Sequence, residues 1–215
     1  MLNYTVTSNH IHLLVVDGKE DDTIPSSLQP IAGRAGQQYN QRKQRRGAFW
    51  EDRYHATAVE SGEHLIHCLV YIDLNRVRAG VVGHPNQWPC GGYREIQNPK
   101  QRYGIVDYER LIELLRMKKL AGVQESCNGR VEEALCREEQ CCQAKWTESI
   151  AVGSEQYVGA IKREPGVRAT GRTVTEEGGM RESETTYGSH YDAEKRSVRP
   201  CNTFLWNLTS DSSMP

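Results

Sequence analysis

Two histidines flank one apolar residue in the stretch SNHIHLLVV, residues 8–16. The apolar run that follows them is short, ends in two valines and is closed by an Asp-Gly pair, which favours a buried strand over a helix. Because side chains alternate along a strand, His10 and His12 would point to the same face and could hold one metal ion together. The same pattern also fits two polar residues at a strand edge, so it needs support from the rest of the chain.

A tyrosine and an asparagine four residues apart form the second chemical motif. Ser61 suits the N-cap of a helix over about residues 62–79, and Gly80 suits the position after its end. Tyr71 and Asn75 would project from one face of that helix. A positioned tyrosine phenolate can attack a phosphodiester, and a divalent ion held by imidazole nitrogens and an amide oxygen can polarise the phosphate. Spacing alone does not show that this helix meets the histidine strand.

The most basic stretch of the chain lies between these two motifs. Arginines and lysines are interleaved with Tyr, Phe and Trp across residues 34–54. Basic and aromatic side chains together can bind phosphates and stack on unpaired bases. A solvated helix end followed by a strand with core aromatics has the same composition, so both interpretations stay open at this point.

Composition limits the other classes of function. The formal net charge of −1 does not exclude a nucleic-acid partner, because a near-neutral total can hide a basic face. Seven cysteines without CxxC spacing, two of them adjacent, indicate reduced thiols in the cytoplasm. No apolar stretch approaches the roughly 20 residues that span a bilayer, and the N-terminus lacks a secretion-signal pattern. We therefore expect a cytoplasmic protein without membrane contact.

Hydrophobic patterning predicts the elements that must position these residues. We expect a hairpin of strands at residues 2–7 and 10–16, a helix from about Pro30 to residue 43, and a strand over residues 48–59. Helices are expected over residues 107–119 and around 131–149. From about Gly153 the composition predicts a flexible arm, with a final apolar cluster at residues 203–208 that docks back onto the body.

Three segments in a fixed order now carry a family resemblance. NHIHLLV at residues 9–15, WEDRY at 50–54 and YIDLNRVRAG at 71–80 together resemble the REP-associated tyrosine transposases, relatives of the IS200-like, single-tyrosine HUH transposases. The resemblance covers about residues 2–115. It implies metal-dependent cleavage and rejoining of single-stranded hairpin DNA, of the repetitive extragenic palindrome type, through a covalent 5′-phosphotyrosine intermediate.

The resemblance also implies a role for each motif residue. Tyr71 matches the nucleophile, and His10, His12 and Asn75 match the ligands of a divalent metal. Because Mg²⁺ prefers oxygen ligands whereas imidazole suits Mn²⁺, the site is expected to accept either ion. The implied partner is single-stranded DNA with hairpins, bound by a monomer or homodimer. The side chains expected to contact DNA are Arg42, Lys43, Arg45, Arg46, Arg53 and Tyr54.

The implied fold class is α+β, with a ferredoxin-like antiparallel sheet and helices on one face. The catalytic core would span residues 1–118, followed by a C-terminal extension over 119–215 that is helical and then largely flexible. Two features depart from the family pattern. Arg76 stands where the family has Pro, which removes a helix stop and could shift the end of the Tyr71 helix. The family's first strand and helix are also missing, and that strand is central, between the histidine strand and the strand ending at Val59.

Two other hypotheses remain beside the enzyme. A catalytically inactive remnant would bind single-stranded or hairpin DNA through the basic stretch without cleaving it. A metal hydrolase would use His10, His12 and one further histidine, but no general base with suitable spacing is evident. The candidates for that further ligand are His55, His64 and His67.

Overall fold

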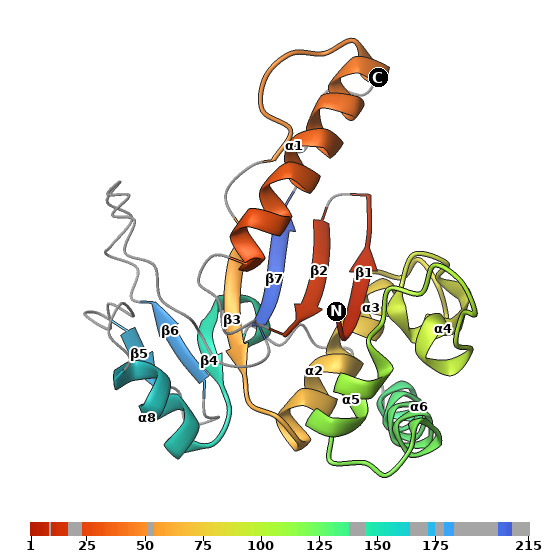
Figure 1. The fold of residues 1–215 in the computed structure, drawn as a ribbon, viewed down its shortest axis with the longest axis vertical. Coiled ribbons are helices and arrows are strands. Elements are labelled where there is room, and N and C mark those ends of the chain that lie inside the picture. The colour runs from red at the N-terminus through yellow and green to blue at the C-terminus, as the bar shows by residue number, and fades with distance from the viewer. Residues whose placement is uncertain are drawn as a thin grey trace.

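The chain is a mixed α+β protein in the computed structural model, which describes residues 1–8, 10–16, 23–50, 54–137, 145–163, 172–174, 179–182 and 202–207. The last three ranges are strands described by their backbone. Among the described residues, no helix is long and apolar enough to cross a membrane. The sheet has the strand order β1-β2-β7-β3-β4-β6-β5 (Figure 1).

The predicted N-terminal hairpin is confirmed. Strands β1 (Asn3–Val6) and β2 (His10–Val15) pair antiparallel, with Thr5 opposite His12. Thr7 closes the turn, because its hydroxyl donates to the His10 carbonyl at 2.7 Å and accepts from the His10 amide at 2.9 Å. The turn therefore sets the register in which the two histidines enter the sheet.

A strand from the far end of the chain lies between β2 and β3. Strand β7 (Asn202–Asn207) pairs antiparallel with β2 on one side and with β3 (His55–Val59) on the other. Leu205 is opposite His12 in one ladder and His55 in the other. The expected docking of the final apolar cluster is thus confirmed, and the position in which the resemblance implied a missing strand is occupied by β7.

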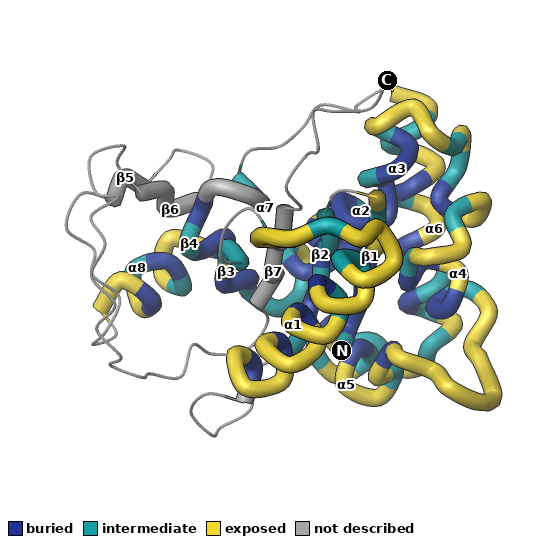
Figure 2. The backbone as a smooth tube through the Cα atoms, turned by 90° about the horizontal axis from the view of Figure 1, so that it is seen from above, coloured by how far each residue is buried: buried dark blue, intermediate teal, exposed yellow. Residues whose placement is uncertain are grey.

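Helices cover both faces of the sheet, so the expectation of helices on one face is wrong. Helix α1 (Thr23–Lys43) packs Ile24 and Leu28 on Leu13 and Val15 of β2. Helix α2 (Glu63–Asp73) packs on the opposite face, where Leu14 joins the main core. Figure 2 shows α1 on one side of the strands and α2, α3 (Asn75–Arg78) and α6 (Leu120–Cys136) on the other. The alternation of β2 side chains thus separates the α1 face from the face that carries the histidines.

Several boundaries differ from the sequence-based prediction. Helix α1 begins at Thr23 and runs through Pro30, because its buried stripe of Ile24, Leu28 and Ala32 stabilises the helix by packing. Strand β3 starts at His55 rather than near residue 48. Helix α6 ends at Cys136, although a helix was expected around residues 131–149.

The region expected to be a flexible arm contains regular elements. Helix α8 (Glu155–Arg163) buries Val158 and Ile161 against β4 (Ser149–Val152). The other elements, in chain order, are η1 (Pro85–Gln87), α4 (Gly92–Gln97), α5 (Tyr108–Leu114), α7 (Lys145–Glu148), β5 (Arg172–Val174) and β6 (Gly179–Glu182).

A buried carboxylate ties β1 to the helices behind it. Glu95, only 1% exposed, accepts hydrogen bonds from the Ile105 and Val106 amides and from the Tyr4 hydroxyl, and it pairs with Lys100 at 3.0 Å. Burial alone raises the pKa of Glu95, but the Val106 amide, Lys100 and the Ile105 amide outweigh it, so the pKa lies below its usual 4.5. The ionised form of Glu95 therefore stabilises the fold.

We expect Glu95→Gln to lower the free energy of unfolding by about 2 kcal/mol at pH 7, because charged hydrogen bonds are lost inside the protein. A depressed pKa contributes stability above the unfolded-state value and loses it as the pH falls through the folded-state value. The difference from the unmodified chain should therefore shrink below about pH 4.5. Urea unfolding from pH 3 to 8 measures it. Glu113→Gln, at an exposed ion pair with Arg110, is the control, and an equal loss in both variants would contradict the role of Glu95.

Candidate metal and tyrosine site

The last turn of α2 and the short helix α3 carry the tyrosine and the asparagine. Helix α2 ends at Asp73, and Leu74 links it to α3, which begins at Asn75. The chain stays nearly helical through this link, because the Leu74 amide still donates to the Val70 carbonyl at 2.9 Å. Gly80 then adopts φ 67°, a left-handed conformation that ends the helical segment. Tyr71 and Asn75 consequently face β2 together.

Three polar side chains from β2 and α3 converge on one point. The Asn75 Nδ2 atom lies 3.1 Å from His10 Nε2 and 2.9 Å from His12 Nε2, and Asn75 Oδ1 lies 3.3 Å from His10 Nε2. The two imidazole rings meet edge to face, with centroids 4.9 Å apart. The expected set His10, His12 and Asn75 is therefore brought together by the fold.

This geometry suits a divalent cation. Octahedral ions with bonds of ~2.1 Å place neighbouring ligand atoms about 3 Å apart, which is the spacing between the Asn75 amide and both imidazoles. The amide oxygen and nitrogen are interchangeable by a flip, so Oδ1 can take the Nδ2 position. Among the described residues, no three His, Cys, Asp or Glu side chains gather in metal-binding geometry. A cation here would therefore need the Asn75 oxygen as its third protein ligand.

Both histidines are held in the neutral form that binds metals. Burial, with smaller contributions from His10 and Arg78, lowers the pKa of His12 to about 3. Burial also lowers the pKa of His10, and Arg76 and Arg78 act in the same direction against the Asn75 hydrogen bond. Within the described part of the chain, His12 Nδ1 is buried without a hydrogen-bond partner. The cluster thus lacks one contact that commonly orients a ligand histidine.

Tyr71 lies beside this cluster and is only 6% exposed. Its ring centroid is 6.0 Å from that of His12 and 6.0 Å from that of Trp146. The Arg78 guanidinium stacks 4.2 Å from the ring centroid and donates to the Tyr71 carbonyl at 2.6 Å. The phenol therefore lies between the imidazoles, a cation and an aromatic side chain of the C-terminal extension.

A buried carboxyl connects this segment to β1. Asp73 accepts a hydrogen bond from Asn3 Nδ2 at 2.9 Å, and Asn3 Oδ1 accepts from the Tyr4 amide. Burial raises the pKa of Asp73 to about 7, although the Asn3 hydrogen bond lowers it. The contact fixes the end of α2 against the strand next to the histidines.

Arg76, at the position where the resemblance led us to expect Pro, is buried. It is 8% exposed, and its guanidinium lies 4.7 Å from the Trp88 ring centroid. Trp88 Nε1 in turn donates to the Val6 carbonyl at the end of β1. The helical segment ends at Gly80 as expected, so Arg76 has not displaced that end.

The basic stretch is not brought to the metal cluster. Arg42 and Lys43 lie in the last turn of α1, on the other face of the sheet, and α1 runs past the end of the sheet (Figure 1). Arg45 donates to the Ala48 carbonyl, and Arg46 is exposed beside it. Tyr54 packs on the α1 core, and Arg53 lies outside the described residues. The described members of the predicted DNA-contacting set are therefore separated from the candidate nucleophile.

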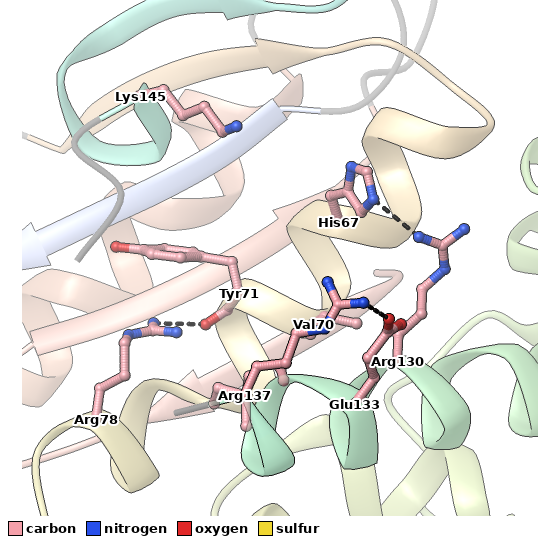
Figure 3. Close-up of a pocket in the computed structure, with 10 residues that line it drawn as sticks. His67, Val70, Tyr71, Arg78, Arg130, Glu133, Arg137 and Lys145 are labelled. Carbon is pink, nitrogen blue, oxygen red and sulfur yellow. Dashed lines mark hydrogen bonds and ion pairs between the residues drawn. The ribbon is translucent and has the colours of Figure 1, made fainter. Parts of the chain in front are cut away.

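A cavity of about 360 Å³ beside Tyr71 was missed by the sequence reasoning (Figure 3). One wall is a helical stripe at positions 67, 70 and 71 of α2, continued by Leu74 directly after it. The opposite wall has the same helical spacing, at positions 130, 133 and 134 of α6 and at its C-cap, residue 137, and Arg78 and Lys145 complete the lining. The signal was the recurrence of charged residues at positions 130, 133 and 137. It was hidden because the α6 boundaries were predicted wrongly.

No protein-family profile, curated protein or solved structure matches the chain.

The contact between Arg76 and Trp88 leads to a stability prediction. Arg76→Ala should lower the free energy of unfolding by about 1–2 kcal/mol, because it removes a largely desolvated cation–π contact. Arg76→Lys should recover only part of this loss, because an ammonium cannot stack as a planar guanidinium does. Thermal and urea unfolding measure both variants. Arg94→Ala, at an exposed position of α4, is the matched control, and equal effects at positions 76 and 94 would contradict the prediction.

Proposed function

We propose that the chain is a metal-dependent DNA strand transferase that cleaves and rejoins single-stranded hairpin DNA through Tyr71. The observation that carries this proposal is the convergence of His10, His12 and Asn75 on one point next to the Tyr71 ring. This convergence puts two neutral imidazoles and a side-chain amide within reach of one cation, beside a buried phenol. The same four residues are those that the family resemblance selects.

In the proposed reaction Tyr71 Oη attacks the scissile phosphorus. A bond forms between phosphorus and the phenolic oxygen while the bond to the 3′ oxygen breaks. The phenol proton passes to solvent, the released 3′ oxygen takes up a proton, and a 5′-phosphotyrosine remains. Rejoining is the reverse, with a 3′ hydroxyl as the nucleophile. The Arg78 guanidinium, 4.2 Å from the ring, attracts the negative charge that develops on the phenolic oxygen.

His10, His12 and Asn75 would hold Mg²⁺ or Mn²⁺, and the bound ion would polarise a non-bridging oxygen of the scissile phosphate. The protein keeps both imidazoles neutral by burial. It orients them by placing alternate residues of one strand on one face. The metal ligands therefore need little rearrangement on binding.

We further propose a ferredoxin-like sheet in which β7 replaces the family's central strand. In support, β7 is antiparallel to both β2 and β3, between the two strands that such a sheet requires. Every inner edge of β2 and β3 then has a hydrogen-bonded neighbour.

The tyrosine role predicts a covalent product. A 3′-labelled hairpin oligonucleotide with Mn²⁺ or Mg²⁺ should give a labelled protein–DNA adduct that survives denaturing electrophoresis, because the 5′-phosphotyrosine keeps the 3′ fragment on the protein. Tyr71→Phe should abolish the adduct, because phenylalanine has no nucleophilic oxygen. Tyr103→Phe, at a position that is 93% exposed, should leave it unchanged. An adduct that persists in the Tyr71→Phe protein would remove Tyr71 from this role.

The metal role is tested without catalysis. Asn75→Ala should weaken Mn²⁺ binding by at least the ~10–100-fold that loss of a supporting contact costs a metal site. Titration followed by electron paramagnetic resonance of free Mn²⁺ measures the affinity. Asn98→Ala, at the exposed C-cap of α4, controls for loss of an amide elsewhere. Unchanged Mn²⁺ affinity in a folded Asn75→Ala protein would exclude the proposed ligand set.

The burial of Tyr71 under Trp146 favours a second candidate function, DNA binding without cleavage. In that case the oligonucleotide binds with strong salt dependence, no adduct forms and His10→Ala changes nothing. The metal-hydrolase hypothesis has less support. His55 contacts the Ser149 carbonyl, His64 pairs with Glu60, and His67 contacts Arg130.

A further inference from the structure

The cavity beside Tyr71 has a cationic lining. Among the described residues that line it, Arg78, Arg130, Arg137 and Lys145 stand against one carboxylate, Glu133. Its volume of about 360 Å³ falls within the ~300–1,000 Å³ of ordinary ligand sites. Figure 3 shows the Arg78 guanidinium beside Tyr71, with Arg137 directed to Glu133 and Arg130 directed to His67. A positive cavity next to a candidate nucleophile suits an anionic substrate.

The ion pairs in the cavity wall are exchangeable. Arg137 contacts Glu133 at 2.6 Å, with the two side chains 61% and 55% exposed. Arg130 contacts Glu63 at 2.6 Å and donates to His67 at 2.8 Å. Exposed pairs of this kind contribute little to stability. A phosphate can therefore compete for these guanidinium groups at small cost, and bidentate Arg–phosphate contacts are strong.

The cations of the cavity lining lie on different elements and have different local partners. Arg137 follows the last turn of α6, where a positive charge interacts favourably with the helix dipole. Arg130 lies more than a turn earlier, and Lys145 comes from a different element, with its ammonium 5.4 Å from the Trp146 ring centroid. Their common property is the cavity that they line.

We propose that this cavity binds a backbone phosphate of the single-stranded DNA, next to the phosphate that Tyr71 attacks. The inference rests on the proposed function and adds a binding surface supplied by α6 and α7. Trp146 covers one side of the Tyr71 ring, and Tyr71 itself lines the cavity. The DNA strand thus reaches the buried phenol of Tyr71 by passing Arg130, Arg137 and Lys145, rather than by passing the basic end of α1.

The test measures DNA binding by the full chain in the absence of divalent metal, so that cleavage cannot contribute. Fluorescence anisotropy of a labelled hairpin oligonucleotide with a single-stranded flank is recorded from 50 to 300 mM salt. Arg137→Glu should weaken binding about 10-fold and lower the salt slope by ~0.7, the value for one phosphate contact on a single strand. Arg137→Gln should weaken DNA binding less than Arg137→Glu does. It places no second carboxylate beside Glu133, so the fold is not perturbed by charge repulsion there.

Arg110→Glu is the matched control, because Arg110 also forms an exposed ion pair within one helix but does not line the cavity. If both Arg137 variants bind the DNA as tightly as Arg110→Glu does, the proposal is overturned, even if the wild-type chain forms the Tyr71 adduct. Selective loss at Arg137 supports the cavity even if no adduct forms, in which case only the proposed catalysis fails. Inorganic phosphate is also tested as a competitor of the DNA at constant ionic strength. If it competes to the same extent in Arg137→Glu as in the wild type, this would also count against the proposed cavity site.

Discussion

Backbone pairing of β2 on both of its edges is the constraint on which the candidate site depends. Strand β1 holds one edge through a short hairpin, and β7 holds the other with six paired residues. A slip of one residue in either ladder would turn His10 and His12 to the α1 face and bring Ile11 and Leu13 to the site. Because the two ladders meet at the same strand, each one opposes a slip in the other.

The α2–α3 segment must then be held at a fixed height over that strand. Two contacts with β1 do this at opposite ends. The Asp73–Asn3 hydrogen bond fixes the start of β1, and Arg76 reaches its end through Trp88 and the Val6 carbonyl. Asn75 lies between Asp73 and Arg76 in sequence. The position of the third candidate ligand is therefore set by contacts on both sides of it.

Short sequence patterns correctly predicted the structural features that depend only on residues close together in the chain. The hairpin, the shared face of the two histidines and the left-handed Gly80 all follow from alternation and turn chemistry. Features that depend on contacts between distant parts of the chain could not be predicted in this way. Pro30 suggested a helix start, but packing of Ile24 and Leu28 on β2 extends α1 before it. Likewise, the place of β7 depends on open edges of β2 and β3, which a pattern within residues 202–207 cannot reveal.

The C-terminal half contributes to both the sheet and the surroundings of Tyr71, the candidate nucleophile. Without β7 the histidine strand would lose a neighbour, and without Trp146 the Tyr71 ring would lose an aromatic contact. A phenol that is 6% exposed can react only where a substrate reaches it. Since the basic end of α1 lies on the other face, the proposed reaction requires the charge that guides a DNA strand to Tyr71 to come from the elements around the cavity. Trp146, which packs beside the ring, and Lys145, which lines the cavity, are neighbours in α7, so the contact that covers the ring and one of the cations come from the same helix.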